Sequence, residues 1–440
     1  MVDSANSLII STPPAETQQQ HHERQAAELV MQGFSKLFIK CAPITITDQP
    51  QETTRRETRS MSSKLINTKR ELLERLQTTL LPRLQGQMEH LSELFLIRQL
   101  SDLQPDLLIQ RQSELDQSLD EIQAARTTLA QEPSASLMNS DSELEGIKRY
   151  RLSILTRLLA VELFSVLRDQ CQVSCKTIQL FLTNAARGNP GPLGGAFLHQ
   201  VVSAIRLRVF KSISHALDRS DFCILQWRWP AGFPVIEQHL HQHLRLIKRQ
   251  EDCWLVHDPV SSDEPATDSL VPLQRAIVAL LKLARLFYKK LSSERGIGRL
   301  ERFMPRFSGL SSAQLATLGE SPNRFFAQLT ALYELTHDDS SSEAERDEEE
   351  EDPDSIYHLS HLIRQIQSNF SDALRIVEYF ITLLPVSAAG SASSSDTDSH
   401  QTQCYFRTWF ENWNSSFTLA IHNLNVIVNA FIASAESGST

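Results

Sequence analysis

Glycine and proline are scarce in this sequence, with 14 and 18 residues among 440. Both gather in short connectors, and few segments alternate apolar and polar residues with the two-residue period of a strand. The densest cluster, GNPGPLGG at residues 188–195, lacks the Lys-Ser/Thr ending and the preceding strand of a phosphate-binding loop. These absences argue against a sheet and against a P-loop nucleotide-binding site.

The six cysteines are scattered, and none forms the paired spacing of a zinc or redox site. Cys171 and Cys175 are four residues apart but have no second pair to complete a metal cluster. The first residues are polar and lack the basic and apolar regions of a secretory signal. We therefore expect reduced thiols in a cytosolic or nuclear protein that is not secreted.

A basic domain is also missing. The formal net charge is −10, and eleven of the 53 acidic residues fall in residues 337–354. Outside this run acidic and basic residues balance, so no nucleic-acid partner is expected. The run at 338–354 is too charged to join a core and is predicted to be a disordered linker. Two interpretations stay open, an inert linker and a regulatory segment that covers the basic residues of 282–306.

No hydrophobic run is long and pure enough to predict a transmembrane segment. The uncharged stretch at residues 417–435 has nearly the length of a membrane span, but it contains His422, Asn423, Asn425 and Asn429. It is interpreted as a helix of a protein core.

Helical periodicity is what the sequence has in abundance. In residues 64–100 leucines recur every three or four positions, and Pro82 predicts a kink or a restart of the helix. Near the C-terminus an apolar seam follows a heptad and predicts the inside of a bundle. Its members are Phe406, Phe410, Trp413, Phe417, Ala420, Leu424, Ile427 and Phe431. The fold class predicted is all-α, with one or two helical bundles and long disordered connectors.

The connectors divide the chain into predicted regions. Residues 1–63 are predicted to be mostly disordered with one short helix. Residues 64–253 form a first bundle, with a helical stretch at 143–187 broken near Cys171 and an irregular aromatic segment at 222–234. Residues 268–433 form a second bundle, interrupted by the acidic linker at 338–354 and a Ser-rich linker at 386–403.

Two histidines are weak candidates for a metal site. His239 and His243 share one face of a predicted helix, and a third ligand would have to come from elsewhere, such as Cys253 or His257. Trp227, Trp229, Phe233 and Trp254 lie close to them in sequence and either line a pocket or pack in the core. A solvated helix face remains the alternative for the histidines.

A basic segment at residues 282–306 supplies the candidates for an interaction surface. These are Lys289, Lys290, Arg295, Arg299 and Arg302. The alternative is a solvated helix end followed by a loop.

Three segments resemble a large, uncharacterised family of all-helical proteins from rust fungi. They are LLPRLQGQMEHLSELF at 80–95, LARLFYKKLSSERG at 283–296 and FRTWFENWNSSFTLAIHNLN at 406–425. The resemblance spans residues 64–433 and implies an all-helical fold in a eukaryotic, non-secreted setting. That family carries no established activity, so no functional residue is implied. In architecture alone, two bundles with an acidic insertion are similar to cyclin-D-interacting helical proteins.

The function predicted is a non-enzymatic interaction or scaffold protein with a protein partner that the sequence does not identify. The alternative is a small-molecule- or metal-binding bundle, or an enzyme, that uses the His and Trp region at 227–258. No catalytic residue and no cofactor are predicted, and the oligomeric state is left open.

Overall fold

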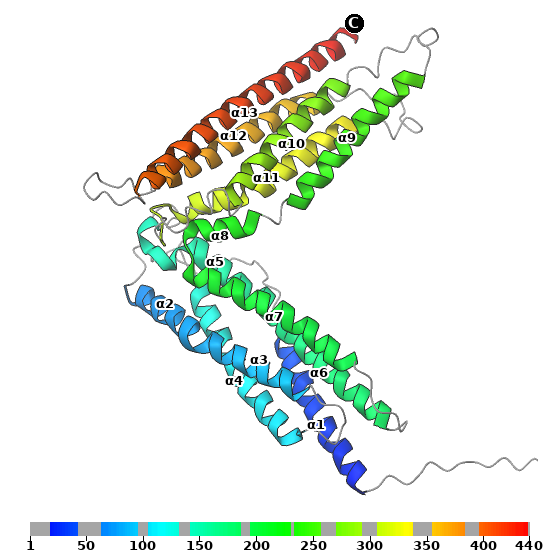
Figure 1. The fold of residues 1–440 in the computed structure, drawn as a ribbon, viewed down its shortest axis with the longest axis vertical. Coiled ribbons are helices and arrows are strands. Elements are labelled where there is room, and N and C mark those ends of the chain that lie inside the picture. The colour runs from blue at the N-terminus through cyan, green and yellow to red at the C-terminus, as the bar shows by residue number, and fades with distance from the viewer. Residues whose placement is uncertain are drawn as a thin grey trace, which may run out of the picture. The chain divides into compact units, whose positions relative to one another are not determined.

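The fold is seen in a computed structural model, which describes residues 18–42, 63–95, 104–131, 141–185, 194–229, 233–256, 270–292, 306–337, 354–382 and 396–438. All the regular structure within these ranges is helical, so the predicted all-α class is confirmed (Figure 1). The chain divides into two compact units. Unit 1 comprises Met1–Ser134 and Leu152–Leu217, and unit 2 comprises Ala135–Arg151 and Asp218–Thr440.

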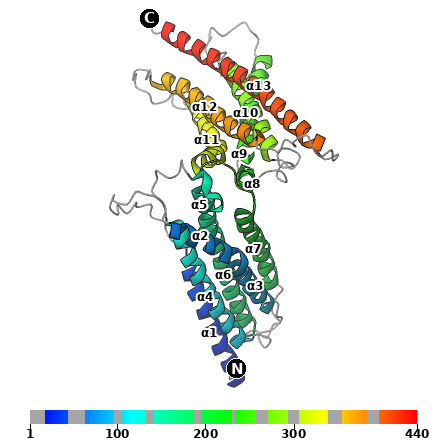
Figure 2. The same ribbon diagram turned by 90° about the vertical axis from the view of Figure 1, so that its left-hand side faces the viewer.

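Unit 1 is built from helices α1 to α7. Their bounds are α1 Gln18–Lys40, α2 Ser63–Arg75, α3 Leu81–Leu94, α4 Pro105–Ala130, α5 Arg149–Arg157 at the junction with unit 2, α6 Phe164–Ala185 and α7 Gly194–Asp218. The first helix packs against α6 and α4 and buries Val30, Phe34 and Leu37 (Figure 2). The short helix expected within residues 1–63 is therefore a full member of the core of unit 1.

Two short π-helical turns interrupt the long helices of unit 1. One spans Leu76–Leu80, and α3 begins directly after it with Pro82 in its first turn. This is the predicted restart, because a proline in the first turn loses no intrahelical hydrogen bond. The second spans Leu158–Leu163, between α5 and α6. The break expected near Cys171 lies here instead, and Cys171 is inside α6.

Unit 2 contains α8 Asp221–Arg228, α9 Phe233–Val256, α10 Leu270–Ser292, α11 Ser312–His337, α12 Asp354–Thr382 and α13 Asp396–Gly438. Two predicted segments need correction. The segment at 222–234 is helical over α8, because the Ser220 hydroxyl accepts from the Cys223 N–H at 3.2 Å and caps the helix. The Ser-rich linker predicted at 386–403 is already helical from Asp396.

The boundary between the units also differs from the predicted one. Residues 64–253 were expected to form one bundle, whereas α8 and α9 belong to unit 2. The cause is packing, since α9 lies along α10 and α8 contacts α11. The segment 135–151, which precedes most of α5 in sequence, also joins unit 2.

Aromatic rings fill the core of unit 2. Six members of the seam expected on the last helix are buried, among them Phe406, Phe410, Trp413 and Phe417, each 1–4% exposed. Ile427 is only half-buried, and the side chain of Phe431 lies outside the described residues. The Trp413 ring stacks on that of Phe417 with centroids 5.0 Å apart, and its N–H donates to the Leu283 carbonyl at 2.9 Å. The last helix thus packs along α10 and α12 as a core helix (Figure 1). Among the described helices, none is long and apolar enough to cross a membrane.

Candidate functional site

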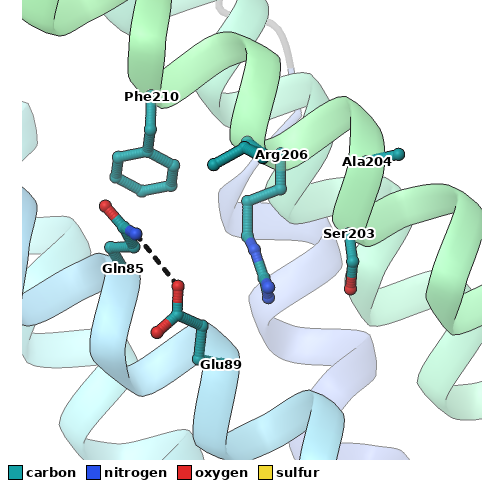
Figure 3. Close-up of a pocket in the computed structure, with 7 residues that line it drawn as sticks. Gln85, Glu89, Ser203, Ala204, Arg206 and Phe210 are labelled. Carbon is teal, nitrogen blue, oxygen red and sulfur yellow. Dashed lines mark hydrogen bonds between the residues drawn. The ribbon is translucent and has the colours of Figure 1, made fainter.

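A groove in unit 1 runs between α3 and α7 and has a volume of about 310 Å³. It is called here the α3–α7 groove. Its lining consists of Gln85 and Glu89 from α3 and Ser203, Ala204, Arg206, Leu207 and Phe210 from α7. Figure 3 shows Gln85 and Glu89 facing Arg206 and Phe210 across it.

The helical period explains why these side chains line a groove. On α3 the buried stripe includes Leu84 and Met88, and each is followed by a polar residue, Gln85 or Glu89. Because successive residues are turned by about 100° around a helix axis, these two side chains lie at the edge of the buried face. They are joined by a hydrogen bond of 2.9 Å from Gln85 Nε2 to Glu89 Oε1 (Figure 3). The same offset places Leu207 beside the buried Arg206 on α7.

Arg206 ties the two walls of the groove together. Its side chain is 8% exposed, and Nη1 donates to the Met88 carbonyl at 2.9 Å and to the Ser92 hydroxyl at 3.0 Å. Burial lowers the pKa of Arg206, and the negative charge of Glu89 opposes this shift. A guanidinium remains protonated in proteins even so. The groove therefore has a charged floor and a largely apolar α7 wall.

The outer face of α7 carries exposed apolar residues next to the exposed Arg208 and Lys211. Val201, Ala204 and Ile205, called here the α7 ridge, follow one another at helical spacing, and the two larger side chains are 42% and 44% exposed. Leu207, between the ridge and the groove, is 64% exposed. The opposite face of α7 is in the core, with Val202 and Ile213 among its buried residues. Exposed apolar residues that follow one another on a helix face are a feature of interaction surfaces.

The two candidate metal ligands have separate hydrogen-bond partners in unit 2. His239 Nε2 lies 3.1 Å from Thr330 Oγ1, and burial lowers the pKa of His239. His243 is 1% exposed, and its Nδ1 is hydrogen-bonded to Gln274 Oε1. Within the described part of the chain, no group of three His, Cys, Asp or Glu side chains could hold a metal ion. Of the proposed third ligands, the side chain of Cys253 and the whole of His257 fall outside the described residues.

The tryptophans of this region have different environments. Trp229 is 1% exposed, donates from Nε1 to the Leu318 carbonyl at 3.3 Å and meets the Phe222 ring edge-on. Trp227 is 37% exposed. The side chain of Trp254 lies outside the described residues. Trp229 is therefore a core residue rather than part of a pocket wall shared with Trp227.

The basic interaction candidates are only partly described. Lys289 is exposed on α10. Lys290 instead donates to the Tyr405 hydroxyl at 2.7 Å and lies 4.5–5.3 Å from the ring centroids of Tyr405, Phe406 and Trp409. These cation–π contacts therefore stabilise the packing of α13 against α10. Arg295, Arg299 and Arg302 lie outside the described residues, as does nearly all of the acidic run at 338–354.

A buried ionic cluster in unit 2 was not predicted. The Asp221 side chain is 0% exposed, and its two carboxylate oxygens receive Lys148 Nζ and Arg151 Nη1, each at 2.8 Å. The Ser308 N–H and hydroxyl also donate to it, at 2.9 and 2.7 Å. Burial raises the pKa of Asp221, but Arg151 and Lys148 outweigh this effect and the net shift is downward. The Asp221 carboxylate thus has its charge and hydrogen-bonding capacity satisfied by residues of the chain itself, so we interpret the cluster as structural.

A second carboxylate fixes the same segment. Asp141 accepts from the Arg149 N–H at 3.0 Å and from the Ser312 N–H at 2.7 Å, and the Ser312 hydroxyl accepts from the Tyr150 N–H at 2.8 Å. These bonds attach residues 141–151 to the start of α11. The cluster joins residues up to 171 positions apart, so no local sequence signal could have indicated it.

Unit 1 also contains a buried histidine, His199, that the sequence pattern did not indicate. His199 on α7 is 1% exposed, its ring stacks on Phe95 with centroids 4.8 Å apart, and Nδ1 lies 3.0 Å from Gln170 Nε2. Because the Gln170 amide nitrogen is a donor, Nδ1 is assigned as the acceptor and the ring as neutral. Burial lowers the pKa of His199 to about 4.

Comparison with known families identifies two domains of unknown function in the chain. DUF8723 matches residues 69–224 and DUF8721 matches residues 220–426. The two matches meet near the boundary between unit 1 and unit 2, and the α3–α7 groove falls within the first. Neither the curated proteins nor the solved structures contain a match to the chain.

Proposed function

We propose that this chain is a non-enzymatic helical interaction or scaffold protein and that the α3–α7 groove, with the α7 ridge beside it, is its binding surface. The observation that carries the proposal is the exposure of Leu207, which lines the groove and is 64% exposed. Apolar residues that border a groove are a common feature of protein-binding surfaces.

The polar groups of the groove support binding rather than catalysis. Arg206 donates to the backbone and to a serine of α3, so it serves to hold the two walls together. Gln85 and Glu89 are hydrogen-bonded to each other along the rim. A helix laid in such a groove would meet apolar surface from α7 and polar groups from α3, which is the arrangement of helix-in-groove recognition.

The proposed setting is the cytosol or the nucleus. None of the five cysteines whose side chains are described forms a disulfide bond with another of them, which fits a reducing compartment. Within the same proposal, the two domains of unknown function would correspond to the helical family of rust fungi that the sequence resembles.

Site-specific photo-crosslinking tests the proposed surface. A photoreactive benzoylphenylalanine replaces Leu207 in the full chain, which is expressed in its native cell and irradiated. The expected result is a discrete crosslinked product of higher mass, because the replaced side chain lies in the bound surface. The matched control carries the same replacement at Leu29 of α1, which is also in unit 1 and is 57% exposed.

The control separates binding from chance collision, since both side chains are large, apolar and exposed. Equal crosslinking at positions 207 and 29 would mean that the groove is not a specific binding surface. No product at position 207 would have the same meaning, provided that helix content by circular dichroism is unchanged.

A further inference from the structure

The α3–α7 groove and the α7 ridge lie side by side on one surface of unit 1. Their shared axis is α7, because Leu207 and Phe210 line the groove while Val201 and Ile205 stand on the outer side of the same helix. The surface thus has a hollow on one side of α7 and an exposed apolar strip on the other side of the same helix. A surface of this kind can be complementary to itself.

Charges of opposite sign lie on the two sides of this surface. On the α3 side Glu89 and Glu93 are exposed one helical turn apart. On the ridge side Arg208 is exposed, one turn after Ala204. Glu89 and Leu207 line the same groove, so Arg208 stands at about the height of Glu89 along the helices. One edge is therefore acidic and the other carries a guanidinium.

We infer that the occupant of the groove is a second copy of this chain, related to the first by a two-fold axis parallel to α7. Such an axis exchanges the two sides of the surface and keeps every residue at the same height along the helix. It lays the ridge of each copy into the groove of the other and brings Arg208 of one copy to Glu89 of the other. An interface of this type is isologous, and both contacts occur twice.

The other simple arrangement is disfavoured by the same residues. A two-fold axis perpendicular to α7 in the plane of the surface places ridge against ridge and the α3 edge against the α3 edge. Glu89 and Glu93 then face their own copies, and like charges across an interface are unfavourable. We therefore infer the parallel axis, because it places the ridge against the groove and pairs Arg208 with Glu89.

Small residues allow the close approach that this arrangement needs. Gly86 on α3 is partly exposed, and a Cβ atom built on it would have no heavy atom within 4 Å. Ala204 is the smallest member of the ridge and lies on its groove side, close to the proposed axis. The two copies of Ala204 are therefore neighbours in the dimer. Lys211 lies one turn after Leu207, so the axis also brings its two copies near each other.

This inference rests on the proposed function, since it names the partner at the proposed surface. Sedimentation equilibrium of the full chain should show a monomer–dimer equilibrium. Glu89→Arg and Arg208→Glu should each weaken the dimer about tenfold or more, and combining them should restore it, because the pair is then reversed rather than broken. Lys211→Gln should tighten the dimer by removing a like-charge pair.

Disulfide trapping tests the direction of the axis. In a background with the exposed Cys404 replaced by serine, Ala204→Cys should give a dimer linked at position 204 on mild oxidation. The control Leu29→Cys should give none. A chain that sediments as a monomer up to concentrations well above micromolar overturns the inference. A dimer unaffected by both charge reversals overturns it as well, because its contact is then elsewhere.

The outcomes also separate this inference from the proposed function. If photo-crosslinking at position 207 captures a different protein while the purified chain is monomeric, the groove is a binding surface but not a homodimer interface. If position 207 captures nothing, both fail together.

Discussion

Replacing Asp221 by asparagine should destabilise unit 2 far more than its small change in volume suggests. The carboxylate oxygens accept four hydrogen bonds, from Lys148, Arg151 and the N–H and hydroxyl of Ser308. An asparagine amide has one oxygen, so its NH₂ group must face at least one of these donors in either orientation. Lys148 and Arg151 also lose the carboxylate that both of them contact.

The magnitude follows from the burial of the group. Lys148 and Asp221 are 0% exposed and Arg151 is 3% exposed, so solvent screens the cluster little. Removing one partner of a buried ion pair costs about 3–5 kcal/mol. The matched control is Asp372→Asn, which breaks an exposed pair with Arg375 on α12 and should change stability by less than about 0.5 kcal/mol.

Denaturant unfolding, followed by tryptophan fluorescence and circular dichroism, measures the effect. Trp229 and Trp413 lie in the core of unit 2 and report its unfolding. The transition of unit 2 should shift to lower denaturant in Asp221→Asn and stay in place in Asp372→Asn. A triple variant with Lys148→Met, Arg151→Met and Asp221→Leu should recover much of the loss, because no unpaired charge remains. Equal stability of the two asparagine variants would refute the reasoning.

The pH dependence gives a second measure of the same carboxylate. The pKa of Asp221 is lower in the folded protein than in the unfolded chain. Its contribution to stability is therefore complete above the unfolded pKa of about 3.9 and is lost as pH falls through the lowered folded pKa. Acid unfolding of unit 2 should thus begin at higher pH in Asp221→Asn than in the parent chain.

Two further predictions concern the buried rings. The pKa of His199 is about 4 in the folded protein and about 6.5 in the unfolded chain. Between these pH values the unfolded chain binds more protons than the folded protein. The free energy of unfolding of unit 1 should therefore fall by about 2 kcal/mol between pH 7 and pH 5. Urea unfolding at pH 7 and pH 5 measures this difference in stability, and His199→Gln should abolish the difference. If the variant keeps the same pH dependence of stability as the parent chain, the His199 ring is not the cause. Trp413→Ala should cost about 3–5 kcal/mol in unit 2, since a buried aromatic side chain and its hydrogen bond to Leu283 are both lost. A nearly neutral effect in thermal unfolding would place the seam of α13 at the surface.

Local order was largely readable from the sequence. Helix formation depends on contacts three and four residues apart, so the leucine period around Pro82 and the heptad seam on α13 predicted helices, a restart and a buried face. The start of α11 is stabilised just as locally, since the Ser311 N–H donates to Gln314 Oε1 at 2.8 Å in a capping box. The segment containing α8 was predicted to be irregular but is helical, because the Ser220 hydroxyl caps its first turn.

The roles of single charged and apolar side chains were decided by the tertiary structure. Lys148, Arg151 and Asp221 look in sequence like any charges on solvated helix faces, and only packing buries them together. His243 was a candidate ligand by spacing, and only packing buries it and joins its Nδ1 to Gln274 of the neighbouring α10. The exposed apolar ridge of α7 has the composition of a core face. The physical reason is that the period of a helix sets which residues share a face, whereas contacts between distant segments decide which faces are covered.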